Sequence, residues 1–160
     1  MAKIEPSLKQ PAIFLSTLGG IGLLPKAPGT WASLATLAPV FFIERYAGLL
    51  GLIVFCFLVF IIGIWACTHH EKLTKSHDPQ HCVIDECLGQ SLVLLFTPNE
   101  LLFYLLAFAY FRFFDIIKPW PTNWFDRNIN GALGVMLDDV VAGAQAIIAM
   151  ILTVKFLDIF

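Results

Sequence analysis

Residues 47–67 read AGLLGLIVFCFLVFIIGIWAC, a stretch of 21 residues without a charged side chain. An α-helix rises about 1.5 Å per residue, so this stretch is long enough to cross the roughly 30 Å hydrocarbon core of a bilayer. A soluble domain of 160 residues could not bury such a run together with its other apolar side chains. The stretch therefore predicts a membrane helix.

The composition of the whole chain supports this prediction. Hydrophobic residues make up 58% of the chain and charged residues 14%, whereas ordinary soluble domains carry about a quarter charged residues. The net charge is −2, so the basic patch that nucleic-acid-binding proteins need is missing and we expect no nucleic-acid partner. The length allows one membrane-embedded domain, residues 1–160, with a polar N-terminal segment at 1–17.

Four shorter apolar runs accompany the long one. Each ends at charged residues and is too short to span a bilayer alone, but becomes long enough if its polar end is included and faces the protein interior. Stretches rich in glycine and proline separate the runs. We therefore predict an all-α fold, a polytopic membrane helical bundle of about five spanning or partly spanning helices. The shorter runs are residues 31–43, 87–97, 101–111 and 140–154.

The charged residues predict the orientation of this bundle. With the N-terminus in the cytoplasm, eight of the ten Lys and Arg residues fall on the cytoplasmic side, and only Arg45 and Lys155 fall outside. This distribution agrees with the positive-inside rule. The same topology brings most acidic residues to the cytoplasmic face, which is where we expect the chemistry. These acids are Asp78, Asp85, Glu86, Asp115, Asp126, Asp138 and Asp139.

Two acidic pairs, Asp85-Glu86 and Asp138-Asp139, come immediately before apolar runs. Carboxylates at the start of a helix accept hydrogen bonds from its free N–H groups and interact favourably with its dipole, so capping is one interpretation. Two adjacent like charges at a membrane boundary also repel each other. A shared divalent cation such as Mg²⁺ would relieve that repulsion. The pairs alone do not favour either interpretation.

A third group of charged residues begins at Arg112. Arg112 and Asp115 are three residues apart, so on a helix they are neighbours and can form a structural ion pair. Alternatively, Asp115 assists as a metal ligand, and Arg112 or Lys118 contacts a phosphate. Ionisable groups at membrane depth are costly unless they are used, which favours the functional interpretation.

The glycine-rich loop at 19–33 has two interpretations as well. Its backbone N–H groups, with Lys26, Thr30 and Ser33, could hold a phosphate, or the loop could be a plain turn before a helix. Of the remaining reactive side chains, Cys82 and Cys87 with His77 and His81 match no common zinc spacing. We interpret Cys56 and Cys67 as small hydrophobic residues, expect no disulfide scaffold, and expect His69, His70 and His77 to be solvated loop residues.

Several motifs, in their order along the chain, resemble phosphatidylglycerophosphatase A. Each motif is weak alone, but their joint order over residues 18–143 is specific. The motifs are LLPKAPGTW at 23–31, IDE at 84–86, FR at 111–112 followed by Asp115, KPWP at 118–121, DR at 126–127 and GVMLDDVVAG at 134–143.

The resemblance implies a multi-pass enzyme of the bacterial inner membrane with its active site at the cytoplasmic face. The family hydrolyses the lipid phosphatidylglycerophosphate to phosphatidylglycerol and phosphate, and needs Mg²⁺. The resemblance thus favours metal binding over capping. We expect a catalytic and metal-binding group formed by Asp85, Glu86, Asp115, Asp138 and Asp139. We expect a phosphate-binding group formed by Arg112, Lys118, Arg127, Lys26 and Thr30.

Two other classes of protein are alternatives to a phosphatase. An ion-coupled transporter would need polar residues near the centres of its spans, and residues 47–67 contain no charge. A non-catalytic membrane subunit would need packing faces of small residues without acidic pairs, and Gly131, Gly134 and Gly143 permit some such packing.

Overall fold

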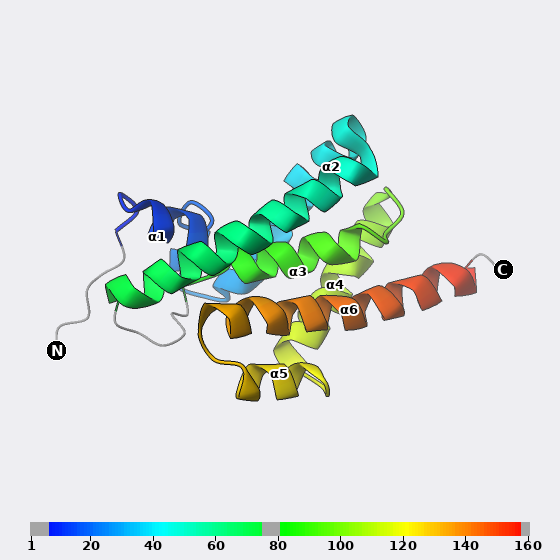
Figure 1. The fold of residues 1–160 in the computed structure, drawn as a ribbon. Helices are drawn as coiled ribbons and strands as arrows, with labels where there is room; N and C mark the ends of the chain where they lie inside the picture. Colours follow the sequence, from blue (N-terminus) through cyan, green and yellow to red (C-terminus); the bar gives the residue numbers. More distant parts are fainter. Residues whose placement is uncertain (1–6, 75–80, 158–160) are drawn as a thin grey trace.

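The computed structural model describes residues 7–74 and 81–157 and contains only helices and connecting segments over these residues (Figure 1). The all-α prediction is confirmed for this part of the chain. The long helices are α2 (Pro28–Thr74), α3 (Ile84–Leu94), α4 (Leu101–Ile117) and α6 (Gly131–Leu157). The short elements are α1 (Pro11–Ser16), the 3₁₀ helix η1 (Ile21–Leu23) and α5 (Thr122–Asn128).

Helix α2 folds back on itself at Gly48, whose φ of 65° and ψ of −168° are not helical. Glycine adopts a positive φ without the steric penalty that a Cβ would bring. The two halves of α2 therefore run in opposite directions, and the predicted runs 31–43 and 47–67 each lie in one of them. Together with α3, α4 and α6 they give one helical pass for each of the five predicted runs, but α3 is too short to reach from one end of the molecule to the other (Figure 1).

Two of the described helices, α2 and α6, are long and apolar enough to cross a membrane by length and composition. Helix α3 has 11 residues and α4 has 17, which correspond to about 17 and 26 Å of helix. The predicted arrangement of five spans is therefore not confirmed, because the five passes differ too much in length. Large apolar side chains on the outer surface of α2, such as Leu50 and Phe57, are exposed, as expected of a helix in contact with lipid.

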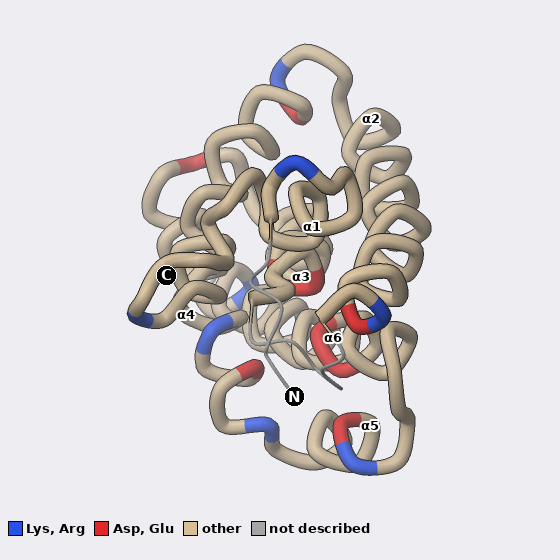
Figure 2. Tube along the Cα trace, turned by 90° about the vertical axis from the view of Figure 1, so that its left-hand side faces the viewer, with Lys and Arg blue, Asp and Glu red and all other residues tan. Residues whose placement is uncertain are grey.

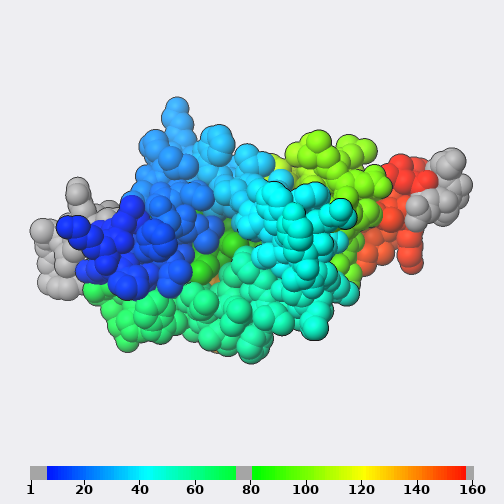
Figure 3. Space-filling model, turned by 90° about the horizontal axis from the view of Figure 1, so that it is seen from above, coloured from blue at the N-terminus to red at the C-terminus, as the bar shows by residue number. Residues whose placement is uncertain are grey.

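The short helix α3 is the centre of the bundle. It packs against α2, α4 and α6, and from above it is visible only between the two halves of α2 (Figure 3). Its side chains Leu88, Val93 and Leu94 are almost completely buried. The acidic residues at the start of α3 are consequently held inside the protein and not on its outer surface.

Helices α3 and α6 approach each other through two glycines. A Cβ added to Gly89 would lie 2.4 Å from the ring of Phe111 and 2.9 Å from the carbonyl oxygen of Asp139, and one added to Gly143 would lie 3.1 Å from the carbonyl oxygen of Gly89. No larger residue fits at Gly89 without movement of a helix. The spacing between α3 and α6 therefore depends on this contact.

The contacts of the N-terminal segment contradict two predictions, the polar segment 1–17 and the solvated position of His70. Residues 11–16 form α1, which packs on α2 and has Ala12 and Ile13 buried, so residues 1–17 are not simply polar. The hydroxyl oxygen of Ser16 lies 2.7 Å from Nδ1 of His70. His70 is fully buried in the last turns of α2, so its assignment to a solvated loop is wrong. His77, Asp78 and Lys75 lie outside the described residues.

A disulfide joins Cys67, near the end of α2, to Cys82, just before α3, with their Cα atoms 6.5 Å apart. The interpretation of Cys67 as an isolated small hydrophobic residue is therefore wrong. Two hydrogen bonds hold the same segment to the N-terminal region: the amide of Val83 donates to the carbonyl of Ser16 at 2.8 Å, and Nδ1 of His81 lies 2.9 Å from the carbonyl oxygen of Gly22. The start of α3 is thus fixed to both α2 and the N-terminal region.

The contact at Gly89 gives a stability prediction. We expect Gly89→Val to lower the free energy of unfolding by about 1–3 kcal/mol, because the added methyl groups overlap Phe111 and the backbone of α6. Thermal unfolding of the purified protein in detergent measures the effect. Ala144→Val, at an exposed position on α6, is the matched control and should leave the midpoint unchanged. Equal midpoints for the two variants would show that α3 and α6 are not in close contact.

Candidate active site

A cavity of about 1090 Å³ opens at the end of the bundle where α3 and α6 begin and α4 ends. All five predicted catalytic acids line it: Asp85, Glu86, Asp115, Asp138 and Asp139. Three of the predicted phosphate-binding residues, Arg112, Lys118 and Thr30, line it as well. Figure 2 looks at the molecule from this end and shows the acidic positions of α3 and α6 close together. The fold thus joins motifs that are about fifty residues apart in the sequence.

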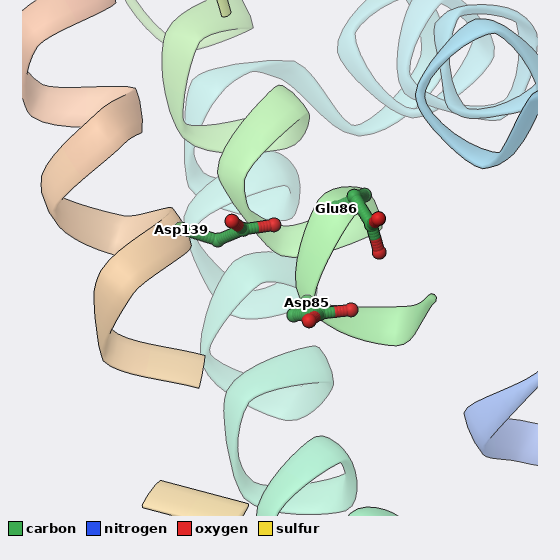
Figure 4. Close-up of side chains that lie close together, drawn as sticks. All are labelled: Asp85, Glu86 and Asp139. Carbon is green, nitrogen blue, oxygen red and sulfur yellow. The ribbon is translucent and has the colours of Figure 1, made fainter. Parts of the chain in front are cut away.

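Three of these acids form a tight group. Asp85 and Glu86 lie in the first turn of α3, and Asp139 projects towards them from α6 (Figure 4). One carboxylate oxygen from each lies within 4.8 Å of the others. Oδ1 of Asp85, Oε2 of Glu86 and Oδ2 of Asp139 are buried and have no hydrogen-bond partner among the described residues. The group offers several oxygen ligands and no donor.

The position of Asp138 and Asp139 excludes capping for this pair. Helix α6 begins at Gly131, so both acids lie in its third turn, and the prediction that they precede the helix is wrong. The segment 132–137, ALGVML, consists mostly of good helix formers and extends the helix towards the N-terminus. Neither carboxylate is therefore close enough to the free N–H groups at the start of α6 to cap them.

The repulsion between the carboxylates can be compared with the stabilisation that a helix N-terminus offers. This comparison distinguishes helix capping from cation binding for the three-carboxylate group. Two ionised carboxylates 4.8 Å apart repel each other by about 3.5 kcal/mol at an effective dielectric constant of about 20. The favourable interaction of a carboxylate with a helix N-terminus is only about 0.3–1 kcal/mol. The start of α3 therefore cannot offset the repulsion, and a positive charge is required if the three groups are ionised.

Arg112 connects three helices beside this group. Its Nη1 lies 2.5 Å from Oδ2 of Asp115, 3.9 Å from Oε1 of Glu86 and 3.4 Å from the hydroxyl oxygen of Ser33. Both the structural ion pair with Asp115 and a position in the cavity are thus observed. The Nε donor of Arg112 is buried without a partner among the described residues, so the guanidinium retains hydrogen-bonding capacity.

Lys118 makes the corresponding connection on the other side of the cavity. It follows α4 in a left-handed conformation, and its Nζ lies 2.5 Å from both Oδ1 of Asp126 and Oδ2 of Asp138. Burial alone would lower the pKa of Lys118, but the hydrogen bonds to Asp126 and Asp138 outweigh burial and raise its pKa above the ordinary value. Lys118 therefore keeps its charge in the cavity.

The start of α2 closes a third side of the cavity. The predicted loop continues only to Ala27, and α2 begins at Pro28. Gly29 lies so close to α3 that an added Cβ would be 1.9 Å from Oε1 of Glu86. Gly29 and Thr30 line the cavity, and the first N–H groups of a helix have no partner within it and favour anions.

The two remaining predicted phosphate ligands are not in the cavity. Lys26 and Arg127 are exposed and do not line it. Lys26 nevertheless lies between Pro25 and Ala27, which do line it, and Arg127 follows Asp126, which does as well. The structure therefore places both residues near the rim, and their roles stay predictions.

Three residues near the site have surroundings that the sequence did not predict. Asp126 was visible in the DR motif, but its contact with Lys118 depends on the placement of α5. Ser33 contacts Arg112 across helices, which no local pattern reveals. Gln90 is fully buried on α3, one turn after Glu86, and neither its amide oxygen nor its nitrogen has a partner among the described residues. Its position in an apolar run gave no signal.

The charges of the lining indicate what the cavity can bind. Among the described residues, seven acids line it, and Arg112 and Lys118 are the only Lys and Arg residues that do so. An anionic phosphate would be repelled by this excess of negative charge unless cations entered with it. Carboxylate oxygens are the ligands that Mg²⁺ prefers, and the unpartnered oxygens of Asp85, Glu86 and Asp139 fit this cation.

Comparison with known proteins finds relatives that match most of the chain. The family model described as phosphatidylglycerophosphatase A matches residues 14–154, slightly more than the 18–143 predicted. Phosphatidylglycerophosphatase A of Haemophilus influenzae is 37% identical over 145 residues, which cover 90% of this chain and 89% of the relative. That of Escherichia coli is 36% identical over 146 residues, covering 89% and 83%.

A third relative carries a different, provisional name. It is named "Putative phosphatidylinositol-3-phosphatase" and comes from Bacteroides thetaiotaomicron. It is 35% identical over 151 residues, which cover 88% of this chain and 94% of the relative. No solved structure matches the chain. The family match over most of the chain and the two relatives of the same name show that the chain is an enzyme and belongs to the phosphatidylglycerophosphatase A family.

Proposed function

We propose that the protein hydrolyses phosphatidylglycerophosphate to phosphatidylglycerol and phosphate in a Mg²⁺-dependent reaction at the surface of the bacterial inner membrane. Family membership supports the substrate and the reaction. The observation that supports the metal is the group of three carboxylates with unpartnered buried oxygens, all within 4.8 Å. The alternatives of a transporter or a non-catalytic subunit lose support because the chain belongs to a phosphatase family.

Asp85, Glu86 and Asp139 are the residues that would hold Mg²⁺. When bound, the ion supplies positive charge against the phosphate oxygens and lowers the pKa of a coordinated water. Asp115 and Asp138, predicted as further ligands, are already ion-paired with Arg112 and Lys118 at 2.5 Å. We therefore assign them first to the orientation of these two cations.

Arg112 and Lys118 are suited to bind the phosphate. Each is fixed by a carboxylate, so little side-chain entropy is lost when it binds an anion. The bond that breaks joins phosphorus to the terminal glycerol oxygen. The attacking water gives up a proton and the departing glycerol oxygen gains one, and a carboxylate of the cluster can take the first of these protons. The N–H groups at the start of α2, with Thr30, are further contacts for phosphate oxygens.

The membrane location is supported by two observations. Helices α2 and α6 are long and apolar enough to cross a bilayer, and the acidic cavity lies at one end of the bundle. Glu44 and Tyr104, which share a hydrogen bond of 2.7 Å, lie towards the opposite end. A lipid headgroup could therefore enter the cavity from the membrane surface while its acyl chains stay in the bilayer.

The proposed reaction is tested by phosphate release from phosphatidylglycerophosphate in detergent micelles, with and without Mg²⁺. We expect release only with Mg²⁺. Asp139→Asn should lower turnover by about a hundredfold or more, because one of the three proposed Mg²⁺ ligands is lost and the developing charge is stabilised less well. Glu44→Gln, at the other end of the bundle, is the control and should retain activity. No release by the wild-type protein under either condition would contradict the proposed function.

The roles of metal ligand and phosphate contact can be separated. Lys118→Met should raise KM for the lipid by about tenfold, since one charge-assisted hydrogen bond is worth about 1.5–3 kcal/mol. The same variant should have a smaller effect on the Mg²⁺ concentration that gives half the maximal rate. Asp85→Asn should mainly raise that Mg²⁺ concentration. Steady-state rates over a matrix of lipid and Mg²⁺ concentrations measure both quantities. The same pattern of change in both variants would show that the two roles are not separate.

The orientation is tested by thiol labelling of cysteine variants in a background without native cysteines. Lys26→Cys, beside the cavity, should react with a membrane-impermeant reagent only in inverted vesicles. Tyr46→Cys is the paired control, because Tyr46 is 83% exposed at the opposite end of the bundle, and it should react only in intact spheroplasts. The reverse result would place the active site outside the cytoplasm.

A further inference from the structure

We propose that the acyl chains of the lipid substrate leave the cavity sideways, between the loop before α2 and the last turn of α4, across Leu24 and Ile116. This inference rests on the proposed function and extends it, because it assigns a place to the part of the substrate that does not react. It concerns residues outside the acidic motifs.

The cavity has an apolar side in addition to its acidic one. Its larger apolar side chains are those of Leu23, Leu24, Ile116, Ile129 and Val135. Two of them are also exposed on the outside of the protein, Leu24 at 42% and Ile116 at 66%. A side chain that lines a cavity and is exposed as well lies at its opening. Leu24 and Ile116 therefore mark an apolar part of the opening, whereas the exposed lining residues His81, Asp126 and Asn130 mark a polar part.

The start of α2 and the end of α4 face each other across Arg112. Ile116 follows Arg112 by four residues on α4, so their side chains are neighbours, with Cβ atoms about 5–6 Å apart. Leu24 precedes Gly29 by five residues, and an added Cβ on Gly29 would lie 3.3 Å from Nη1 of Arg112. A lipid whose phosphate lies beside Arg112 is thus within one helical turn of the opening between these two elements.

The outer surface beyond this opening is apolar on both sides. On α4, Phe113 and Ile117 are 53% and 58% exposed, and on α2, Trp31 and Leu34 are exposed as well. Residues 28–43 of α2 and 101–111 of α4 contain no charged side chain. Acyl chains that leave the cavity here meet no charged group along the bundle, as required for chains that remain in the bilayer.

The charge at the opening matches the second phosphate of the substrate. Phosphatidylglycerophosphate carries a phosphodiester between the terminal phosphate and the acyl chains. Lys26 is exposed, two residues after Leu24 and between two lining residues, so it is placed to contact this phosphodiester and not the phosphate that is removed. This part of the opening, with one cation and two apolar side chains, fits a phospholipid better than a water-soluble phosphate monoester.

Kinetics with two substrates test the route. The quantity measured is the ratio of kcat/KM for dioleoyl phosphatidylglycerophosphate to kcat/KM for the same molecule with its acyl chains removed. We expect Ile116→Gln and Leu24→Gln each to lower this ratio about tenfold. Ile148→Gln on α6, where Ile148 is 61% exposed, is the matched control and should leave this ratio unchanged. An unchanged ratio in the first two variants, or an equal decrease in the control, would overturn the route.

Photo-crosslinking gives a second readout that needs no turnover and keeps the tested positions apolar. Benzoylphenylalanine replaces Ile116 or Ile148, and the probe is a radiolabelled diacyl phosphonate analogue of the substrate. We expect excess unlabelled analogue to reduce labelling at Ile116 and not at Ile148. Equal competition at the two positions would overturn the route. No phosphate release from either substrate by the wild type would instead contradict the proposed function.

Discussion

The close approach of α3 and α6 is the contact on which the rest of the site depends. Gly89 and Gly143 remove the side chains that would separate the two helices, and this brings Asp139 to within 4.8 Å of Asp85 and Glu86. The cost is a local accumulation of negative charge on carboxylates of which two, Asp85 and Asp139, are buried. Favourable packing of the apolar faces of α3 and α6 stabilises an arrangement that the carboxylates alone would oppose.

Two cations keep the surrounding acids in place, and of the central group only Glu86 is within ion-pair distance of one of them, Arg112. Arg112 links α4 to α3 and α2 through Asp115, Glu86 and Ser33. Lys118 links the end of α4 to α5 and α6 through Asp126 and Asp138. The charged residues thus also connect the helices around the cavity. A substitution at one of these residues is expected to affect both the chemistry and the geometry of the opening.

The sequence predicted which residues line the site better than it predicted where the helices begin and how distant segments meet. The uncharged run 47–67, the four shorter apolar runs and the order of the motifs were enough for the all-α fold and for eight lining residues. The placement of Asp138 and Asp139 inside α6 was missed because the charged pair was interpreted as a boundary, whereas the helix formers before it extend the helix to Gly131. The contacts of Asp126, Ser33 and His70 depend on how distant segments meet, and no local pattern contains that information.

The difference in helix length explains why there is a cavity at all. Asp85 and Asp139 lie at the same level, but α3 begins one residue before Asp85 while α6 begins eight residues before Asp139. Helix α6 therefore extends about 10 Å beyond the start of α3. Helix α4 continues five residues past Arg112 to Ile117, or about 7 Å. A short central helix among longer ones leaves a recess with carboxylates at its base, and because the surrounding helix ends are partly apolar, the recess suits a headgroup that remains attached to a membrane.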